Sequence, residues 1–184
     1  MIIFRKATEN DIDSIEKIYS DIHTCEENGE TTTGWIRGVY PTRETAETAL
    51  SRDDLFVLED EGKILGAAVI NRTQCQEYKY GKWNNDVSEE KVTVLHTLVI
   101  SPKVSGKGYG RSFVDFYEKY AIQNESPYLR MDTNERNVKA REMYKKLRFK
   151  EVGTVPCDFN GIKNVKMILL EKCAGGKYIA ENNK

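Results

Sequence analysis

The feature that most constrains this chain is a glycine-rich segment at residues 98–113, LVISPKVSGKGYGRSF. An apolar run leads through a proline into glycines at alternate positions, and a helix-like pattern follows; the glycines are Gly106, Gly108 and Gly110. Glycines spaced in this way let backbone N–H groups converge, and a helix that begins beside them adds the partial positive charge of its N-terminus. With Lys107 and Arg111 alongside, the segment indicates an anion-binding loop; the plainer alternative is a flexible strand-to-helix turn.

Two well-known phosphate loops do not fit this segment. A Walker A loop requires G-x-x-x-x-G-K-[ST], but Gly110 is followed by Arg111, and Ser105 stands where the first glycine belongs. A dinucleotide-binding fingerprint requires G-x-G-x-x-G, and here Arg111 occupies the position of the last glycine. The sequence therefore excludes both motifs and leaves the physical arrangement of strand, glycine loop and helix.

The rest of the chain alternates between the two periodicities of regular structure. Apolar or β-branched runs predict strands at residues 1–5, 55–58, 64–70, 92–100, 128–132, 149–155 and 165–170. Helical spacing predicts helices at residues 9–22, 41–50, 110–122 and 137–147. Hairpin turns are indicated at Asp60–Lys63 and at Asn160–Gly161, and residues 74–90 read as a long polar loop. Strand–helix–strand crossovers predict an α/β (α+β) fold in which part of the sheet is parallel.

Length and composition bound the organisation of the chain. Its 184 residues suffice for one core, and no repeat or composition break divides them, so we expect a single domain at residues 1–172 and a loose C-terminal tail at 173–184. The formal net charge of −1 gives no global field for nucleic acid or an anionic membrane. No apolar run approaches the ~18 residues of a membrane span, and no secretory signal begins the chain, so we expect a cytoplasmic protein.

Cysteine and histidine usage argues against a metal site. The four cysteines are far apart and form no C-x-x-C pair, and the chain has only two histidines, His23 and His96. A structural zinc site or a disulfide framework is not indicated in a chain of this size. We therefore expect no metal cofactor.

The glycine segment resembles the acyl-CoA loop of the GNAT superfamily of N-acetyltransferases. In that family an apolar strand ends in V-x-P and is followed by [QR]-x-x-G-x-[GA]. Gly108 and Gly110 match the glycines, Pro102 matches the proline, and Ser105 stands where Arg or Gln is usual. The resemblance implies that this loop wraps the pyrophosphate of coenzyme A mainly through backbone amides.

A second stretch, NVKAREMYKKLRF at residues 137–149, resembles the family pattern N-x-x-A-x-x-[LF]-Y-x-x-x-G-F. The matching residues are Asn137, Ala140, Tyr144 and Phe149. Arg148 replaces the usual glycine, which commonly ends a helix in a left-handed conformation that Arg adopts at a cost of about 1 kcal/mol. The two motifs stand in the family's order with a predicted strand between them, and the resemblance covers residues 3–171.

This resemblance implies a GNAT fold: a single mixed, mostly antiparallel, twisted sheet of about seven strands with a central parallel pair, flanked by about four helices. It implies transfer of an acetyl group from acetyl-CoA to a primary amine of a small molecule or peptide, by direct attack in a ternary complex. The alternative is a non-catalytic acyl-CoA-binding or sensing module with the same fold. Retention of Tyr144 and His96 argues against that alternative, and Ser105 argues weakly for it. A nucleoside triphosphatase is disfavoured by the missing lysine. The protein is expected to be a monomer or a homodimer.

The resemblance also assigns residues to the cofactor. Backbone N–H groups of the strand end 98–100 would polarise the thioester carbonyl, which is worth ~3 kcal/mol for one hydrogen bond in a dry site. The expected cofactor-binding residues are Leu98, Val99, Ile100, Ser105, Gly106, Lys107, Gly108, Tyr109, Gly110, Arg111, Asn137, Ala140 and Tyr144. The 137–147 helix is strongly basic; its Lys139, Arg141, Lys145 and Lys146 form either a solvated face or, for one of them, a contact to the 3′-phosphate.

Two residues are expected to carry the proton transfers. By spacing alone, Tyr144 belongs to an apolar helix stripe and reads as core; the resemblance implies that it faces the CoA sulfur and protonates the departing thiolate. His96 has the only side chain on its strand with an ordinary pKa near neutrality. The stretch Leu95-His96-Thr97-Leu98 resembles the L-H-x-L strand of arylalkylamine N-acetyltransferases, which implies a general base. A half-buried strand histidine, or a water relay ending at Glu89 or Glu90, remain the alternatives.

The acceptor amine is expected opposite the cofactor, between the polar segments 25–40 and 74–90. Aromatic residues there are candidates for its apolar walls, chiefly Trp35, Tyr40, Tyr80 and Trp83. Acidic residues there are candidates for attracting a cation: Glu26, Glu27, Glu30 and Asp86. Solvated loops with scattered aromatic residues explain the same pattern, so the sequence leaves the identity of the amine open.

Overall fold

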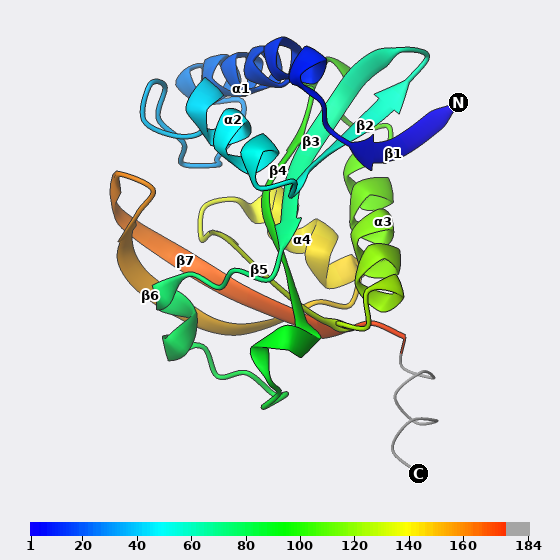
Figure 1. Cartoon of the computed structure of the whole chain (residues 1–184). Coiled ribbons are helices and arrows are strands. Elements are labelled where there is room, and N and C mark those ends of the chain that lie inside the picture. The colour runs from blue at the N-terminus through cyan, green and yellow to red at the C-terminus, as the bar shows by residue number, and fades with distance from the viewer. Residues whose placement is uncertain (176–184) are drawn as a thin grey trace.

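The computed structural model describes residues 1–175 and shows a single seven-stranded mixed sheet (Figure 1). In chain order the strands are β1 (Ile2–Lys6), β2 (Leu55–Asp60), β3 (Lys63–Asn71), β4 (Val92–Ile100), β5 (Tyr128–Asn134), β6 (Lys150–Phe159) and β7 (Ile162–Cys173). Their order across the sheet is β1-β2-β3-β4-β5-β7-β6, and every neighbouring pair is antiparallel except β4 and β5. Within the described residues the α-helices are α1 (Ile12–Glu27), α2 (Arg43–Ser51), α3 (Tyr109–Gln123) and α4 (Val138–Lys146). The expected mostly antiparallel sheet with a central parallel pair is confirmed.

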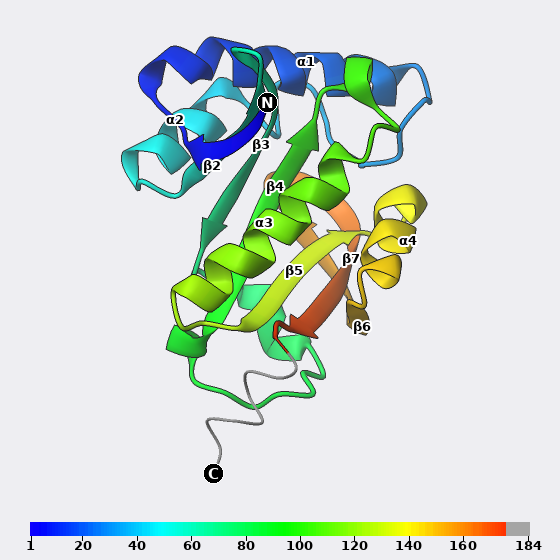
Figure 2. The same cartoon turned by 90° about the vertical axis from the view of Figure 1, so that its right-hand side faces the viewer.

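The helices cover the sheet from both sides. Figure 2 shows α3 lying across the face of β4 and β5, with α4 beside it and α1 and α2 behind the N-terminal strands. The core under α3 and α4 contains Phe113 and Tyr117, and the core under α1 and α2 contains Ile15 and Val57. Fully burying such side chains stabilises the fold by about 1.5–3 kcal/mol each.

Local sequence explains why α3 forms and how it packs. Phe113, Tyr117 and Ala121 recur at helical spacing and are fully buried, as the periodicity predicts. Phe116 on the same face is half-buried, and its ring stacks on Phe4 of β1 at 4.9 Å between centroids. The helix therefore joins the first strand to the middle of the sheet.

Positive φ angles appear where the turn and helix-end patterns predict them. The β6–β7 hairpin turns through Asn160 and Gly161, at φ 50° and 78°. Two successive left-handed residues are the geometry that tight hairpins prefer. Arg148, which follows the C-cap residue of α4, has φ 68°, so it does adopt the left-handed conformation in place of glycine.

The segment 74–90 is the expected long, mostly irregular segment, and its residues alternate between exposed positions and positions packed against the sheet. It contains two 3₁₀ turns, η2 (Gln76–Tyr80) and η3 (Glu89–Lys91), and it buries Tyr78 against β4 and β7. The guanidinium of Arg130 lies 4.0 Å above the Trp83 ring and donates to Gln74 Oε1 at 2.6 Å. Hydrogen bonds from Asn84 to the buried Glu171 fix the other side of the segment.

The parallel strands separate halfway along their length, and this split positions the site. β4 and β5 pair only from Val92 to Leu95, opposite Tyr128 to Met131. Thr97 then has φ 50°, where the β3–β4 register shifts. This conformation is an outlier for a β-branched residue, and a β-bulge bends a strand away from regular pairing. The bulge therefore opens a space between the ends of two central strands.

Tyr117 ties the strands together below the split. Its hydroxyl lies 2.6 Å from the carbonyl oxygen of Thr93 on β4 and 3.1 Å from that of Arg130 on β5. We expect Tyr117→Phe to lower the free energy of unfolding by about 1–3 kcal/mol, because buried carbonyl groups lose their donor. Chemical denaturation checks this, and an unchanged midpoint would mean that the bridge contributes nothing to stability.

The expected C-terminal tail falls mostly outside the described residues. Of residues 173–184, Cys173 is the last residue of β7, and Ala174 is fully buried. Residues 176–184 lie beyond the part of the chain that the structure describes.

Candidate active site

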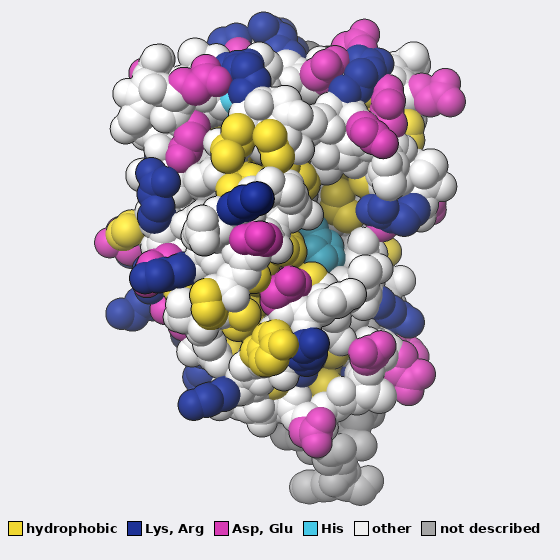
Figure 3. Space-filling model, turned by 90° about the vertical axis from the view of Figure 1, so that its left-hand side faces the viewer, with side chains coloured by type: hydrophobic (Ala, Val, Ile, Leu, Met, Phe, Trp, Pro, Cys, Tyr) yellow, Lys and Arg dark blue, Asp and Glu magenta, His cyan; other side chains and the backbone are white. Residues whose placement is uncertain are grey.

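A large cavity of about 1370 Å³ runs through the split between β4 and β5. One end is lined by the glycine loop and α4, and the other by the segment 30–40 and the β6–β7 hairpin. Figure 3 shows the molecule from the side of this second end, where a histidine side chain lies in a hollow near apolar side chains. Segments far apart in the sequence thus enclose one continuous space.

The glycine loop presents an uninterrupted row of free backbone donors. Gly106 and Gly108 have φ of 83° and 84°, and α3 begins directly after Gly108. Ser112 N donates to Gly108 O at 3.0 Å as the first hydrogen bond of the helix. Within residues 1–175, no backbone N–H from Gly106 to Arg111 has a hydrogen-bond acceptor. These N–H groups and the helix N-terminus form an anion-binding cradle.

The structure brings most of the expected cofactor residues to this cavity. Those that line it are Leu98, Val99, Ile100, Ser105, Gly106, Gly108, Tyr109, Gly110, Arg111, Asn137, Ala140 and Tyr144. Lys107 belongs to the same loop but does not line the cavity. The side chain of Asn137 caps α4 by accepting from Ala140 N at 3.4 Å. The residues present therefore fit an elongated anionic ligand.

Tyr144 lies where core and cavity meet. It is only 6% exposed, and its ring packs edge-on against Phe149 at 6.0 Å between centroids. Its hydroxyl has no hydrogen-bond partner within residues 1–175, although every fully buried polar side-chain atom there has one. The hydroxyl is therefore the part that reaches the cavity, and burial raises the pKa of this phenol so that it stays protonated.

His96 lines the cavity in a fixed orientation. Its Nε2 lies 3.1 Å from both Asn71 Oδ1 and the carbonyl oxygen of Thr73. Asn71 donates from Nδ2 to Asp54 at 2.8 Å, so its Oδ1 is an acceptor. Nε2 must then carry the proton, which leaves Nδ1 as the basic nitrogen. Desolvation lowers the pKa of His96 to about 4, so the ring is neutral at pH 7.

Asp132 is a site residue that the sequence reasoning missed. It is the first residue of β5 beyond the paired stretch, across the split from His96, and it lines the cavity. Tyr78 donates to its Oδ2 at 3.0 Å, and no Lys or Arg lies within salt-bridge distance in the described part of the chain. Desolvation raises the pKa of Asp132 to about 6. One signal pointed to it: a carboxylate at the carboxyl end of a strand predicted to be parallel.

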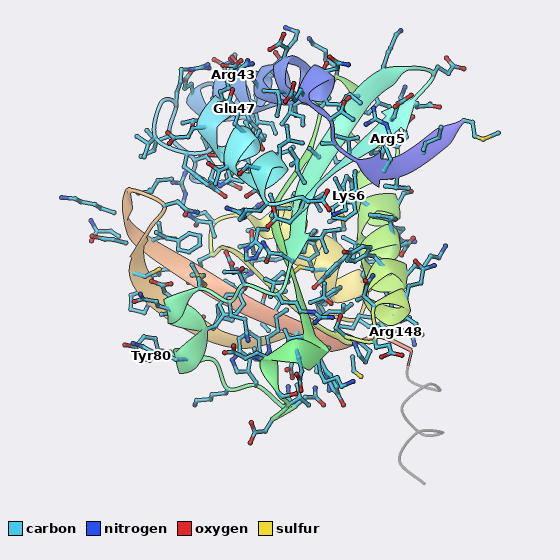
Figure 4. The ribbon with its side chains drawn as sticks, viewed as in Figure 1. Arg5, Lys6, Arg43, Glu47, Tyr80 and Arg148 are labelled. Atoms are coloured by element: carbon cyan, nitrogen blue, oxygen red, sulfur yellow. The ribbon has the colours of Figure 1, made fainter. Side chains whose placement is uncertain are left out.

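Two of the four aromatic residues expected around the acceptor line the cavity. Trp35 and Tyr40 do so and pack edge-to-face at 5.9 Å, and Tyr40 shares a hydrogen bond with the hydroxyl of Thr97. Tyr80 is 63% exposed and points away from the molecule (Figure 4). Trp83 packs under Arg130 instead. Four apolar residues of the β6–β7 hairpin, which the sequence did not single out, line the cavity instead: Phe159, Ile162, Val165 and Met167.

The acidic residues of these segments have different partners. Glu26 accepts from the backbone N–H groups of Thr33 and Gly34 at 2.8 and 3.0 Å, so it shapes the loop before Trp35. Glu27 pairs with Arg37, whereas Glu30 lines the cavity. The relay candidates Glu89 and Glu90 precede β4, at the end opposite the split, and do not line the cavity; nor does Asp86.

Two other kinds of feature are absent from residues 1–175. No three His, Cys, Asp or Glu side chains there are grouped so that they hold a metal ion. None of the helices in that range combines the length and the apolar character that crossing a lipid bilayer requires.

Solved structures with this architecture include bacterial acetyltransferases. A GNAT-family acetyltransferase from Streptococcus agalactiae has a TM-score of 0.77 at 23% identity, covering 94% of this chain and 95% of that one. An N-acetyltransferase from Staphylococcus aureus has a TM-score of 0.69 at 18% identity, covering 95% of this chain and 99% of that one. At these identities the likeness establishes the fold alone, which this chain shares with those acetyltransferases.

Sequence comparison adds the family. The family model described as "Acetyltransferase (GNAT) family" matches residues 13–149. The streptothricin acetyltransferase of Escherichia coli is 28% identical over 130 residues, which is 70% of this chain and 66% of that protein. The chain belongs to the GNAT acetyltransferase family. The family resemblance noted in the two sequence motifs is thereby confirmed.

Proposed function

We propose that the protein transfers the acetyl group of acetyl-CoA to a primary amine of a small molecule or peptide, within a ternary complex. The observation that carries this proposal is one cavity that joins the amide donors of residues 106–111, which have no acceptor within residues 1–175, to Asp132 through the split between β4 and β5. The likeness to a streptothricin acetyltransferase supports a small-molecule amine as the acceptor.

The cofactor side of the cavity supplies binding and polarisation. Acetyl-CoA brings the activated acyl group as a thioester. The amides of residues 106–111 suit its pyrophosphate, and the strand end 98–100 leads from that cradle to the split. Backbone N–H groups aimed at a carbonyl oxygen stabilise the negative charge that develops there, at ~3 kcal/mol for one well-placed donor.

The acceptor side supplies the base. A primary alkylamine with a pKa of ~10 is almost wholly cationic at neutral pH, so it must lose a proton before it attacks. Asp132 attracts the ammonium form and, with a pKa of about 6, accepts its proton better than His96, whose pKa is about 4. Geometry and pKa thus favour Asp132 as the general base and leave His96 Nδ1 as the rival.

Tyr144 donates a proton to the leaving thiolate. A thiolate whose conjugate acid has a pKa of ~8.5 needs a proton donor as the C–S bond breaks. The hydroxyl of Tyr144 is protonated, free of protein partners within residues 1–175, and reaches the cavity. Overall the ammonium nitrogen loses two protons as it becomes an amide. Asp132 takes the first before attack, and the second, lost after the C–N bond forms, balances the proton that Tyr144 gives to the sulfur, so one proton is released to solvent.

Ligand-dependent stabilisation tests the proposal. Acetyl-CoA at about 100 times its Kd should stabilise the protein by about 2.7 kcal/mol, which corresponds to a melting-temperature increase of roughly 5–10 °C for a chain of this size. A parallel screen of amines should release free thiol from acetyl-CoA. Stabilisation by ATP without stabilisation by acetyl-CoA would refute the proposal. Stabilisation by acetyl-CoA without thiol release from any amine would support the non-catalytic acyl-CoA-binding module.

A further inference from the structure

One lysine reaches from α4 to the glycine loop. Lys139 Nζ donates to Ser105 Oγ at 3.0 Å, and both residues line the cavity. Ser105 directly precedes the row of free amides at residues 106–111. The ammonium therefore lies at the entrance of the anion-binding cradle.

This lysine occupies an electrostatically unfavourable position in its own helix. Lys139 is in the first turn of α4, which contains no acidic residue. A cation is disfavoured at the positive N-terminal end of a helix. Within residues 1–175, no carboxylate lies within salt-bridge distance of Lys139. Positive charge from the lysine and from the N-terminus of α3 thus faces one space, and no carboxylate of residues 1–175 pairs with the lysine.

Two neighbouring basic residues are paired elsewhere, whereas Lys107 and Arg111 belong to the glycine loop and the start of α3 themselves. Lys103 pairs with Asp21 at 3.0 Å, and Arg141 pairs with Glu151 at 2.7 Å. Lys145, on the same helix as Lys139, does not line the cavity. Lys139 and Lys146 both line the cavity, and Lys139 is the one whose ammonium hydrogen-bonds to the glycine loop.

We propose that Lys139 binds the pyrophosphate of acetyl-CoA, clamping it against the amides of residues 106–111 from the opposite side of the cavity. This inference rests on the proposed function. Ser105 has no charge with which to bind the diphosphate. Its hydroxyl instead accepts a hydrogen bond from the Lys139 ammonium and orients that charge toward the diphosphate. A cation that stabilises the diphosphate thus comes from α4, on the side of the cavity opposite the loop that carries Lys107 and Arg111.

Calorimetric titration with CoA tests the contact without any need for turnover. Lys139→Ala should raise the Kd of CoA about tenfold, as expected for the loss of one charge-assisted phosphate contact. Lys145→Ala is the matched control, because it removes the same charge from an exposed position of the same helix, and it should change the Kd less than twofold. An unchanged Kd in Lys139→Ala would overturn the inference.

A truncated ligand locates the contact on the cofactor. With 3′-dephospho-CoA, Lys139→Ala should again weaken binding about tenfold, because the pyrophosphate is still present. A loss that disappears with this ligand would place Lys139 at the 3′-phosphate and overturn the assignment.

Moving the charge tests the mechanism. Adding Ser105→Arg to Lys139→Ala should return the Kd to within about threefold of the native value, because a guanidinium at position 105 reaches the same space from the loop. A double variant as weak as Lys139→Ala would show that charge at this point is not what matters. Native protein that fails to bind CoA at all would refute the proposed function, whereas native binding with no effect of Lys139→Ala refutes this inference alone.

Discussion

Asp132→Asn is expected to lower kcat at pH 7 by about 100-fold or more. General bases contribute typically 10²–10⁴-fold, and the amide side chain keeps an acceptor for Tyr78 but cannot take a proton. Because only the proton acceptor is removed, the Kd of acetyl-CoA should stay within about twofold of the native value. Steady-state kinetics and calorimetry on the same preparation measure the two quantities.

The pH profile distinguishes Asp132 from His96. With Asp132 as the base, kcat/KM should rise with pH through a limb near 6 and lose that limb in Asp132→Asn. A limb governed by His96 would fall near 4. The matched control is His96→Gln, whose side-chain amide still donates to Asn71 and Thr73 but lacks a basic nitrogen. A limb that survives in Asp132→Asn and vanishes in His96→Gln would transfer the role to His96.

Stability separates this catalytic effect from a folding defect. The folded-state pKa of Asp132, about 6, lies above the ordinary aspartate value of ~3.9. Folding therefore favours the protonated form, and the stability associated with this group is lost as pH rises from about 4 through 6. At pH 8 the native protein carries a desolvated carboxylate that Asp132→Asn removes. The variant should thus melt at the same temperature as the native protein or higher, while its activity falls.

The parts of this molecule that local sequence determines were predictable. The alternating glycines, the helical stripe of α3 and the Asn160–Gly161 turn are set by φ preferences and periodicity over a few residues. The family motifs added the parallel pair and the position of Tyr144. Even the exceptional residue Arg148 takes the left-handed conformation that its place at the helix end requires.

The rest of the site depends on contacts that no local pattern encodes. Thr97 adopts a left-handed φ because the β3–β4 register shifts there and because its hydroxyl meets Tyr40, 57 residues earlier in the chain. Asp132 becomes a cavity residue only because β4 and β5 stop pairing just before it. Tyr80 and Trp83 looked equivalent to Trp35 and Tyr40 in the sequence, since aromatic residues on a polar segment can face either way.

One residue outside the segment 74–90 did carry a usable signal about how that segment packs. Arg130 lies in the middle of β5 between two buried apolar residues, Leu129 and Met131. A charged side chain in a central strand needs an aromatic or polar partner, and Trp83 and Gln74 are those partners. Arg130 therefore holds Trp83 away from the expected acceptor site and fixes the segment 74–90 against the sheet.

Tyr144→Phe is expected to lower kcat tenfold or more, with the Kd of acetyl-CoA within about twofold of the native value. The hydroxyl has no protein partner within residues 1–175, so its removal should cost little stability. Tyr117→Phe is the matched control and should show the reverse pattern, with lower stability and nearly native turnover, because that hydroxyl bridges β4 and β5. The two variants thereby distinguish the Tyr144 hydroxyl, which donates a proton, from the Tyr117 hydroxyl, which bridges two strands.

An acyl donor with a more acidic thiol tests whether Tyr144 acts as the acid. As the pKa of the leaving thiol falls, its thiolate needs less protonation, so a general acid becomes less important. The rate deficit of Tyr144→Phe, which is the ratio of the native rate to the variant rate, should therefore shrink when an acetyl thioester of an aromatic thiol replaces acetyl-CoA. A deficit caused by a misplaced cofactor would instead persist or grow. A deficit that is equal for both donors would assign Tyr144 to positioning, and full activity with acetyl-CoA would remove it from the mechanism.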